Sequence, residues 1–245
     1  MKELYDTIFK RKSMRKFDDT LSLTEEDLKK IKCQAEKIVP LDAGIKVKIE
    51  LVNKSETTVK RGEYCFLFYS EKKSGYLLNA GYMLEQMDLF LASRDIGVCW
   101  YGLAKPKKSS LCGLDYVIMI AFGKSCSKDF RKSISEFRRK AIEEIWDGDF
   151  DSEVKKAVRL APSACNTQPW RVKSKDKEIK VFRDTKIKSF IPKSMLAYYN
   201  PIDMGIFLCY MEIVLLSKNY RFERVLADEG NKGDDLIEIA VYNII

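Results

Sequence analysis

The sequence APSACNTQPW, at residues 161–170, is a loop of small residues that also carries hydroxyl and amide side chains. It follows a helix predicted at about 151–160 and precedes a strand-like segment at 178–182. Backbone, hydroxyl and amide groups in such a loop can hydrogen-bond to the edge of a planar heterocycle. The alternative interpretation is an ordinary polar turn that leads into a strand.

The elements around this loop predict a mixture of helices and strands. After 178–182 the sequence predicts a loop containing Pro192 and Pro201, an apolar helix at 203–218 and a last strand at 236–242. The first half shows a similar order. It predicts helices at 1–9, 24–38 and 76–94, strands at 45–52, 64–69 and 116–122, and a charged amphipathic helix at 132–146.

The two apolar helices show weak self-similarity. When Gly205 is aligned with Gly81, a shift of 205 − 81 = 124 residues, further identities follow. They are Leu208 with Leu84, Met211 with Met87, Leu215 with Leu91 and Ser217 with Ser93. Two buried helices of similar composition could give this result, but the shared order of elements favours a degenerate internal duplication. We therefore predict two halves, 1–148 and 149–245, within one compact unit.

The composition predicts a globular protein without histidine chemistry. Hydrophobic residues make up 46% and charged residues 33%, which is enough apolar material for a core, and histidine is absent. This absence excludes Ser-His-Asp and Cys-His nucleophiles, His-ligated zinc and His acid–base catalysis. The seven cysteines form no C-x-x-C pair, so no metal site is predicted. Since the N-terminus lacks the apolar segment of an export signal, we expect a cytoplasmic protein.

The net charge of +8 is compatible with several partners. A nucleic-acid binder, a membrane-surface protein, an enzyme for anionic ligands and a merely well-solvated surface all fit it. The sequence has no long basic tail and no aromatic-interleaved RNA motif. Its most apolar stretch, 206–216, is short and is interrupted by Glu212. We therefore expect neither a nucleic-acid partner nor a membrane partner.

A second polar cluster, Arg11-Lys12-Ser13-Met14-Arg15, lies just after the first predicted helix. Guanidinium groups bind phosphate in a bidentate manner, lysine supplies a point charge, and a serine hydroxyl adds a compact donor. The cluster is thus a candidate phosphate clamp. A solvated basic turn is the alternative.

The loop at 161–170 resembles the A-P-S-x-x-N-x-Q-P-W segment of the nitroreductase family of flavoenzymes. Other segments show the same resemblance. Residues 11–17 resemble the family's R-R-S-x-R-x-F start, residues 81–106 its core helix and G-x-x-x-x-G loop, and residues 122–144 its terminal strand, basic phosphate contact and acidic pair. The resemblance implies an α+β sandwich with mixed, mainly antiparallel sheets flanked by helices, in two pseudo-symmetric halves that pack through central apolar helices.

The order of these motifs differs from that of ordinary family members, which form homodimers with FMN at the subunit interface. Here the phosphate motif and the A-P-S loop are 161 − 11 = 150 residues apart. Residues 39–42, where a first such loop is expected, lack its Ser and Asn, and the second half lacks an R-x-S-x-R motif. The chain resembles a subgroup in which one chain imitates the dimer. This implies one FMN site per chain and makes a monomer plausible.

The resemblance also implies which residues contact FMN. In the first half, residues 1–148, they are Arg11, Lys12, Ser13, Arg15, Arg138 and Arg139 at the phosphate and ribityl chain, and Tyr101, Gly102 and Leu103 near the flavin N5. In the second half they are Pro162, Ser163, Ala164, Asn166 and Gln168, along the isoalloxazine ring. Lys60 and Arg61 are further candidates for internal contacts. Cys165 is either a redox-active thiol or a small packed one.

The function implied is that of an FMN-dependent oxidoreductase. It takes a hydride from NADH or NADPH onto the flavin and passes electrons to a nitroaromatic, quinone or similar planar acceptor. The flavin carries the chemistry, so no catalytic side chain and no metal are expected. Two alternatives remain at this stage: a non-catalytic flavin-binding or sensor protein on the same scaffold, and a nucleic-acid binder that uses the positive charge.

Overall fold

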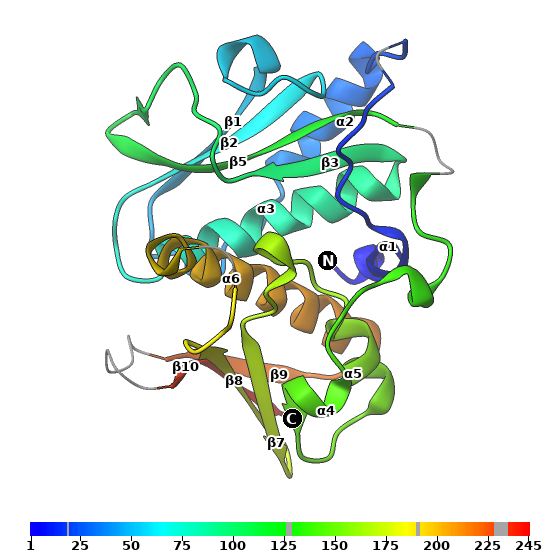
Figure 1. The fold of residues 1–245 in the computed structure, drawn as a ribbon, viewed down its shortest axis with the longest axis vertical. Helices are drawn as coiled ribbons and strands as arrows, with labels where there is room; N and C mark the ends of the chain where they lie inside the picture. Colours follow the sequence, from blue (N-terminus) through cyan, green and yellow to red (C-terminus); the bar gives the residue numbers. More distant parts are fainter. Residues whose placement is uncertain (19, 126–128, 190–191, 228–234) are drawn as a thin grey trace.

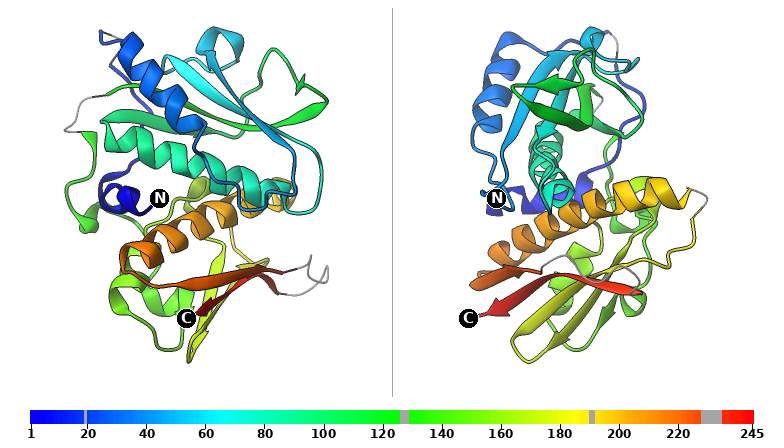
Figure 2. Two further views of the ribbon diagram at one scale, coloured as in Figure 1. Left: turned by 180° about the vertical axis from the view of Figure 1, so that it is seen from behind. Right: turned by 90° about the vertical axis from the view of Figure 1, so that its left-hand side faces the viewer.

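Two long helices cross at the centre of the structure, between two β-sheets (Figure 1). The structure is a computed structural model, and it describes residues 1–245 apart from 19, 126–128, 190–191 and 228–234. Figure 2 shows the helices, α3 (Tyr76–Ser93) and α6 (Lys193–Ser217), stacked between the sheets in both views.

The first sheet has the strand order β1-β2-β5-β3, with neighbours antiparallel and β4 paired to β5. The helix predicted at 24–38 is α2, and Thr24 and Asp27 form a capping box at its start. The elements are η1 (Lys2–Leu4), α1 (Tyr5–Lys10), α2 (Glu25–Ala35), β1 (Val47–Asn53), η2 (Lys54–Glu56), β2 (Tyr64–Ser70), α3, β3 (Ile96–Tyr101), β4 (Ser110–Leu111) and β5 (Leu114–Lys124).

The second sheet has the order β6-β7-β8-β10-β9, in which only the short β6–β7 pairing is parallel among the described strands. Its elements are η4 (Ile134–Glu136), α4 (Ile142–Ile145), β6 (Trp146–Asp147), α5 (Ser152–Val158), η5 (Ala164–Asn166), β7 (Trp170–Lys175), β8 (Glu178–Asp184), α6, β9 (Phe222–Leu226) and β10 (Leu236–Ile244). The strand order β7-β8-β10-β9 in this sheet corresponds to the order β1-β2-β5-β3 in the first sheet. In both, the last of the four strands along the chain, β10 or β5, lies between the second and the third. The predicted α+β class with mixed, mainly antiparallel sheets is confirmed.

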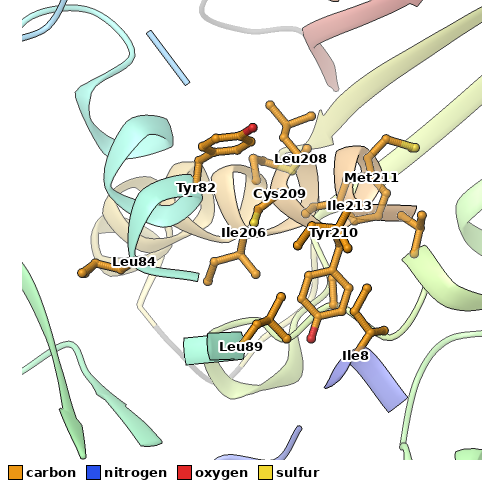
Figure 3. Close-up of a cluster of buried hydrophobic side chains, with 14 of the residues drawn as sticks. Ile8, Tyr82, Leu84, Leu89, Ile206, Leu208, Cys209, Tyr210, Met211 and Ile213 are labelled. Carbon is orange, nitrogen blue, oxygen red and sulfur yellow. The ribbon is translucent and has the colours of Figure 1, made fainter. Parts of the chain in front are cut away.

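The core lies along the two crossing helices. Figure 3 shows Tyr82 and Leu89 of α3 on the side of that helix that faces Ile206 and Cys209 of α6, and all four side chains are buried. By length and composition α6 could cross a membrane, but 83% of its most apolar window is buried inside the structure. This helix is therefore part of the main hydrophobic core, in which it packs against α3.

Two helices differ from the sequence-based prediction. The predicted helix at 132–146 is instead η4 and α4, separated by extended backbone at residues such as Phe137 and Ala141. The extended segment is held by tertiary hydrogen bonds, because Arg138 O accepts from Asn166 Nδ2 and Lys140 N donates to Gln168 Oε1, both at 2.8 Å. These bonds replace the helical ones.

The second difference is the start of α6. It begins at Lys193, ten residues earlier than predicted (203 − 193 = 10), and runs through Pro201. An interior proline costs a helix about 3 kcal/mol. Burial of apolar side chains on both sides, such as Leu196 and Ile202, outweighs that cost.

The segment before residue 148 belongs spatially to the second sheet. Its strand β6 pairs with β7, and Trp146 Nε1 donates to Ser174 Oγ at 2.8 Å. Trp146 also stacks on Phe150, with ring centroids 6.0 Å apart. The sequence-based boundary at 148/149 therefore falls inside one packed unit rather than between the two sheets.

Candidate functional site

Two cavities meet where the segment after α1 approaches the loop at 161–170. Their volumes are about 880 Å³ and 450 Å³, within the range of small-molecule sites. Residues from the two sequence motifs line both cavities: Arg11, Ser13, Arg15, Pro162, Ser163 and Cys165. The fold thus brings together the two motifs that are farthest apart among those the sequence singled out.

The larger cavity is basic. Among its described lining residues are seven cations, namely Arg11, Lys12, Arg15, Lys16, Arg131, Arg138 and Arg139, against the two acids Asp129 and Glu136. Such a cluster concentrates positive potential at a concave surface and favours a phosphate or similar anion.

The smaller cavity is mainly apolar. Trp100 and Ile118 from the first sheet face Met195, Ile202 and Ile206 from α6 across it. Flat aromatic and branched aliphatic walls suit a planar ring system. The joined cavities therefore offer one polar end for an anion and one apolar end for a ring.

Arg11 is buried and forms an internal ion pair. Its Nε donates to Asp88 Oδ2 at 3.1 Å, Nη2 donates to the same oxygen, and Glu85 Oε1 lies 3.9 Å from Nε. Burial alone would lower the pKa of Arg11, but the two carboxylates raise it above its ordinary value. Trp100 Nε1 also donates to Asp88 Oδ2, at 2.8 Å. The predicted phosphate ligand is thus also a structural link to α3.

Other predicted phosphate contacts are more open. Arg15, Lys12 and Arg138 are exposed side chains on the basic cavity, whereas Ser13 is half-buried; Arg15 and Ser13 line the apolar cavity as well. Arg61 Nη1 donates to Arg15 O at 2.6 Å, so this candidate lies beside the motif, whereas Lys60 is exposed and lines neither cavity.

Arg139 connects the first half to the loop. Its Nη1 donates to Asn166 Oδ1 at 2.8 Å, and Nε and Nη2 donate to Leu160 O. Burial lowers the pKa of Arg139 to about 10. Asn166 consequently lines the basic cavity and not the apolar one. The predicted ring contacts that line the apolar cavity are Pro162, Ser163 and Ala164.

The loop at 161–170 has an unusual backbone. Cys165, Asn166 and Gln168 have φ values of 48°, 59° and 51°, in the left-handed region. Side-chain hydrogen bonds hold this conformation, since Ser163 Oγ accepts from Gln168 N at 2.9 Å and Gln168 Nε2 donates to Asn166 O at 3.2 Å. The buried Gln168 lines neither cavity, so the structure gives it a supporting place rather than a ring contact.

The predicted N5 loop lies on the apolar cavity. Gly102 and Leu103 line it, but Tyr101 does not. A Cβ on Gly102 would lie 2.7 Å from the ring of Tyr199, whose hydroxyl donates to Gly102 O at 2.8 Å. The close approach that requires glycine here is therefore that of Tyr199, a residue that the sequence analysis did not single out.

Asp203 is a second residue that the sequence analysis missed. It is 3% exposed, lines the apolar cavity, and its Oδ1 accepts from Ala164 N at 2.8 Å. A charged residue near the start of an apolar run is the signal that could have indicated it. Arg131, whose Nη1 donates to Arg11 O, was missed too, because it lies in a surface segment without a motif.

Cys165 is exposed and lines both cavities, so of the two alternatives for this residue the small packed thiol is wrong. Cys126 lies outside the described residues. Among the residues that the structure does describe, no group of three or more Cys, Asp or Glu side chains is placed to hold a metal ion.

Comparisons with known proteins give one consistent result. A family model described as "Putative TM nitroreductase" matches residues 3–215. A solved structure of a putative nitroreductase from Thermotoga maritima is 20% identical, with a TM-score of 0.63 over 99% of this chain and 93% of that chain. No curated protein matches.

Two shorter solved structures are also similar. A nitroreductase family protein from Clostridium novyi NT is 18% identical, with a TM-score of 0.41, over 53% of this chain and 88% of that chain. A putative NADH dehydrogenase/NAD(P)H nitroreductase from Bacteroides thetaiotaomicron is 13% identical, with a TM-score of 0.46, over 60% of this chain and 98% of that chain.

Proposed function

The chain belongs to the "Putative TM nitroreductase" family and is thus an oxidoreductase, and from this premise we propose that it binds FMN in the joined cavities. We propose further that it takes a hydride from NADH or NADPH and reduces a nitroaromatic, quinone or similar planar acceptor. The cytoplasm, where reduced nicotinamides are available, is the proposed compartment.

The observation that carries the proposal is the junction of a basic cavity with an apolar one. Flavin mononucleotide has a dianionic phosphate at one end and a planar tricyclic ring at the other. Arg15, Lys12 and Arg139 would hold the phosphate, and Pro162 and Trp100 would contact the ring. The residues present therefore fit the group in both charge and shape.

Bound FMN would supply the hydride-transfer chemistry. The chain itself would position the ring and keep water from it, since Ile202, Ile206 and Trp100 form an apolar wall. Cationic groups at the junction, such as Arg15, would stabilise negative charge that develops on the bound ring system. No histidine is needed for these roles.

The purified chain tests the proposal directly. We expect a yellow protein, or one that quenches the fluorescence of added FMN, with flavin absorbance that bleaches when NADH or NADPH is added without oxygen. Addition of a quinone or a nitroaromatic compound should restore the absorbance. A chain that neither carries nor quenches FMN would contradict the proposal.

A non-catalytic flavin-binding or sensor protein is the second candidate. It is favoured by Tyr199, whose ring already lies against Gly102 at the predicted N5 loop. If this contact persists with flavin bound, a nicotinamide has restricted access to that side. Rapid bleaching in an anaerobic stopped-flow experiment would exclude this candidate.

A further inference from the structure

One carboxyl oxygen of Asp203 accepts a hydrogen bond from the backbone, and the other has no hydrogen-bond partner among the described residues. Oδ1 accepts from Ala164 N at 2.8 Å and so anchors the loop at 161–170. Oδ2 is fully buried and forms no hydrogen bond with any residue that the structure describes. The side chain lines the apolar cavity. A buried polar atom without a partner beside a cavity is costly unless a ligand or a proton uses it.

Asn79 occupies the equivalent place in the other half. It precedes Gly81 by two residues, as Asp203 precedes Gly205, and the shift is again 203 − 79 = 124. Asn79 Oδ1 accepts from Leu41 N at 2.8 Å, and Nδ2 donates to Asp42 O at 3.2 Å. An amide is therefore sufficient to anchor this kind of loop. The equivalent position in the second half, which lines the apolar cavity, has an ionisable carboxyl instead.

The surroundings of Asp203 favour its neutral form. Burial raises the pKa of Asp203 well above its ordinary value. The Ala164 N–H acts in the opposite direction, as does the nearby Thr167 hydroxyl, whose oxygen is likewise buried without a hydrogen bond to any described residue. The charged and titratable groups that share its cavity or lie on the facing helix α3 are Arg11, Arg15, Cys99, Cys165, Tyr199, Tyr76, Tyr82, Glu85 and Asp88. Two of the buried groups among these, Arg11 and Asp88, are paired with each other.

We propose that Asp203 is a neutral carboxylic acid in the resting protein and delivers its proton to a planar acceptor that stacks on the flavin ring in the apolar cavity. This inference rests on the proposed function. For a quinone acceptor, one hydride and one proton give the hydroquinone. The hydride comes from the reduced nicotinamide by way of the flavin, and Asp203 supplies the proton. The resulting carboxylate then takes a proton from water, which completes the balance.

The variant Asp203→Asn separates loop anchoring from proton donation, because Asn79 shows that an amide can anchor the loop. In the ligand-free chain, infrared spectra should show a protonated carboxyl band at pH 7 that decreases in the variant. The stability of the wild type relative to the variant should fall as pH rises between the unfolded and folded pKa values, by up to tenfold in the unfolding constant per pH unit. An unchanged band would overturn the proposal whether or not FMN binds.

The loaded protein gives a second readout. We expect Asp203→Asn to bind FMN like the wild type but to reduce a quinone roughly 100-fold more slowly, which is the usual size of a lost general acid. It should reduce ferricyanide, a one-electron acceptor that takes up no proton, at the wild-type rate. The wild-type quinone reaction should slow above the pKa of Asp203, and the variant should lose this dependence.

The control is Asn79→Asp, which places a carboxyl at the equivalent position away from the cavity. It should change the pH dependence of stability but not that of quinone reduction. Wild-type quinone rates in Asp203→Asn, or an equal loss with ferricyanide, would overturn the proposal. A wild-type chain that binds no FMN would instead overturn the proposed function, and the infrared result would still report the protonation state of Asp203.

Discussion

Gly81 and Gly205 lie at the crossing of α3 and α6 in a reciprocal arrangement. A Cβ on Gly81 would lie 1.9 Å from Ile202 O, and a Cβ on Gly205 would lie 1.9 Å from Leu78 O. In each case the nearby carbonyl belongs to the residue three positions before the other glycine. A contact that is reciprocal in this way is isologous. A two-fold interface between identical subunits has this geometry, and here it lies within one chain.

A second pair of contacts repeats with the same spacing. Trp100 Nε1 donates to Asp88 Oδ2, and Arg224 Nη1 donates to Glu212 Oε1. The two donors are 224 − 100 = 124 residues apart, and the two acceptors are 212 − 88 = 124 residues apart, which is the shift that aligns the glycines. These repeated contacts support the proposal that the chain arose by internal duplication.

Alanine at either crossing glycine should destabilise the protein. In an ordinary helix Gly→Ala stabilises by about 1 kcal/mol, but here the helices must move apart, and overpacking costs about 1–3 kcal/mol or more. We expect Gly81→Ala and Gly205→Ala to lower the free energy of unfolding by at least ~2 kcal/mol in denaturant titrations. Gly113→Ala is the control, since nothing lies within 4 Å of its Cβ and only its positive φ is strained, at about 1 kcal/mol. Wild-type stability in Gly81→Ala would contradict the close crossing.

Arg15→Ala should weaken FMN binding. The exposed guanidinium lines both cavities, and loss of a charge-assisted hydrogen bond costs about 1.5–3 kcal/mol, or roughly 10- to 150-fold in Kd. Fluorescence quenching titrations measure this change. Arg221→Ala removes an equally exposed arginine that lines neither cavity and should leave Kd unchanged. Equal Kd values for the two variants would place the phosphate elsewhere.

Arg11→Met should destabilise the apoprotein in a pH-dependent way. The change leaves Asp88 and Glu85 buried without their cation, which typically costs about 3–5 kcal/mol. Burial already raises the pKa of Glu85, and loss of Arg11 removes an effect that opposes this rise. Because acids with raised folded pKa values stabilise the fold below those values, the deficit should shrink as pH falls from 7 to 5. Urea titrations across this range test the sign, and a deficit that grows at low pH would refute it.

Cys165 should report on ligand binding. Its thiol is exposed at the junction of the two cavities, so bound FMN should slow its alkylation several-fold. Mass-spectrometric mapping can follow each cysteine separately. Cys33 is also exposed but lies on α2, so its alkylation rate should not respond to FMN. Equal effects at both cysteines would indicate a general change in the protein rather than occupancy of the cavities.

The purified chain should be a monomer. The reciprocal helix contact that could join two identical subunits is already formed within the chain, between α3 and α6. Light scattering should therefore give a mass near 28.4 kDa with and without FMN. A stable mass of twice this value would show that another surface drives association.

Much of the fold was predictable where a local pattern agrees with tertiary burial. The helix that starts after Thr24, the apolar helix from Tyr76 and the buried strand from Tyr64 all formed at or near the predicted places. The segment at 132–146 did not, because bonds from Asn166 and Gln168, distant in sequence, hold it extended. Amphipathic spacing alone could not show those partners.

For the candidate site, the sequence by itself determined the two motifs, the absence of histidine and the alignment of Gly81 with Gly205. Only the tertiary structure decided that Arg11 is paired with Asp88, that Tyr199 covers Gly102, and that Asp203 lines the apolar cavity. The physical reason is that motif residues depend on local spacing, whereas burial and charge pairing depend on contacts between helices and loops that are far apart in the chain.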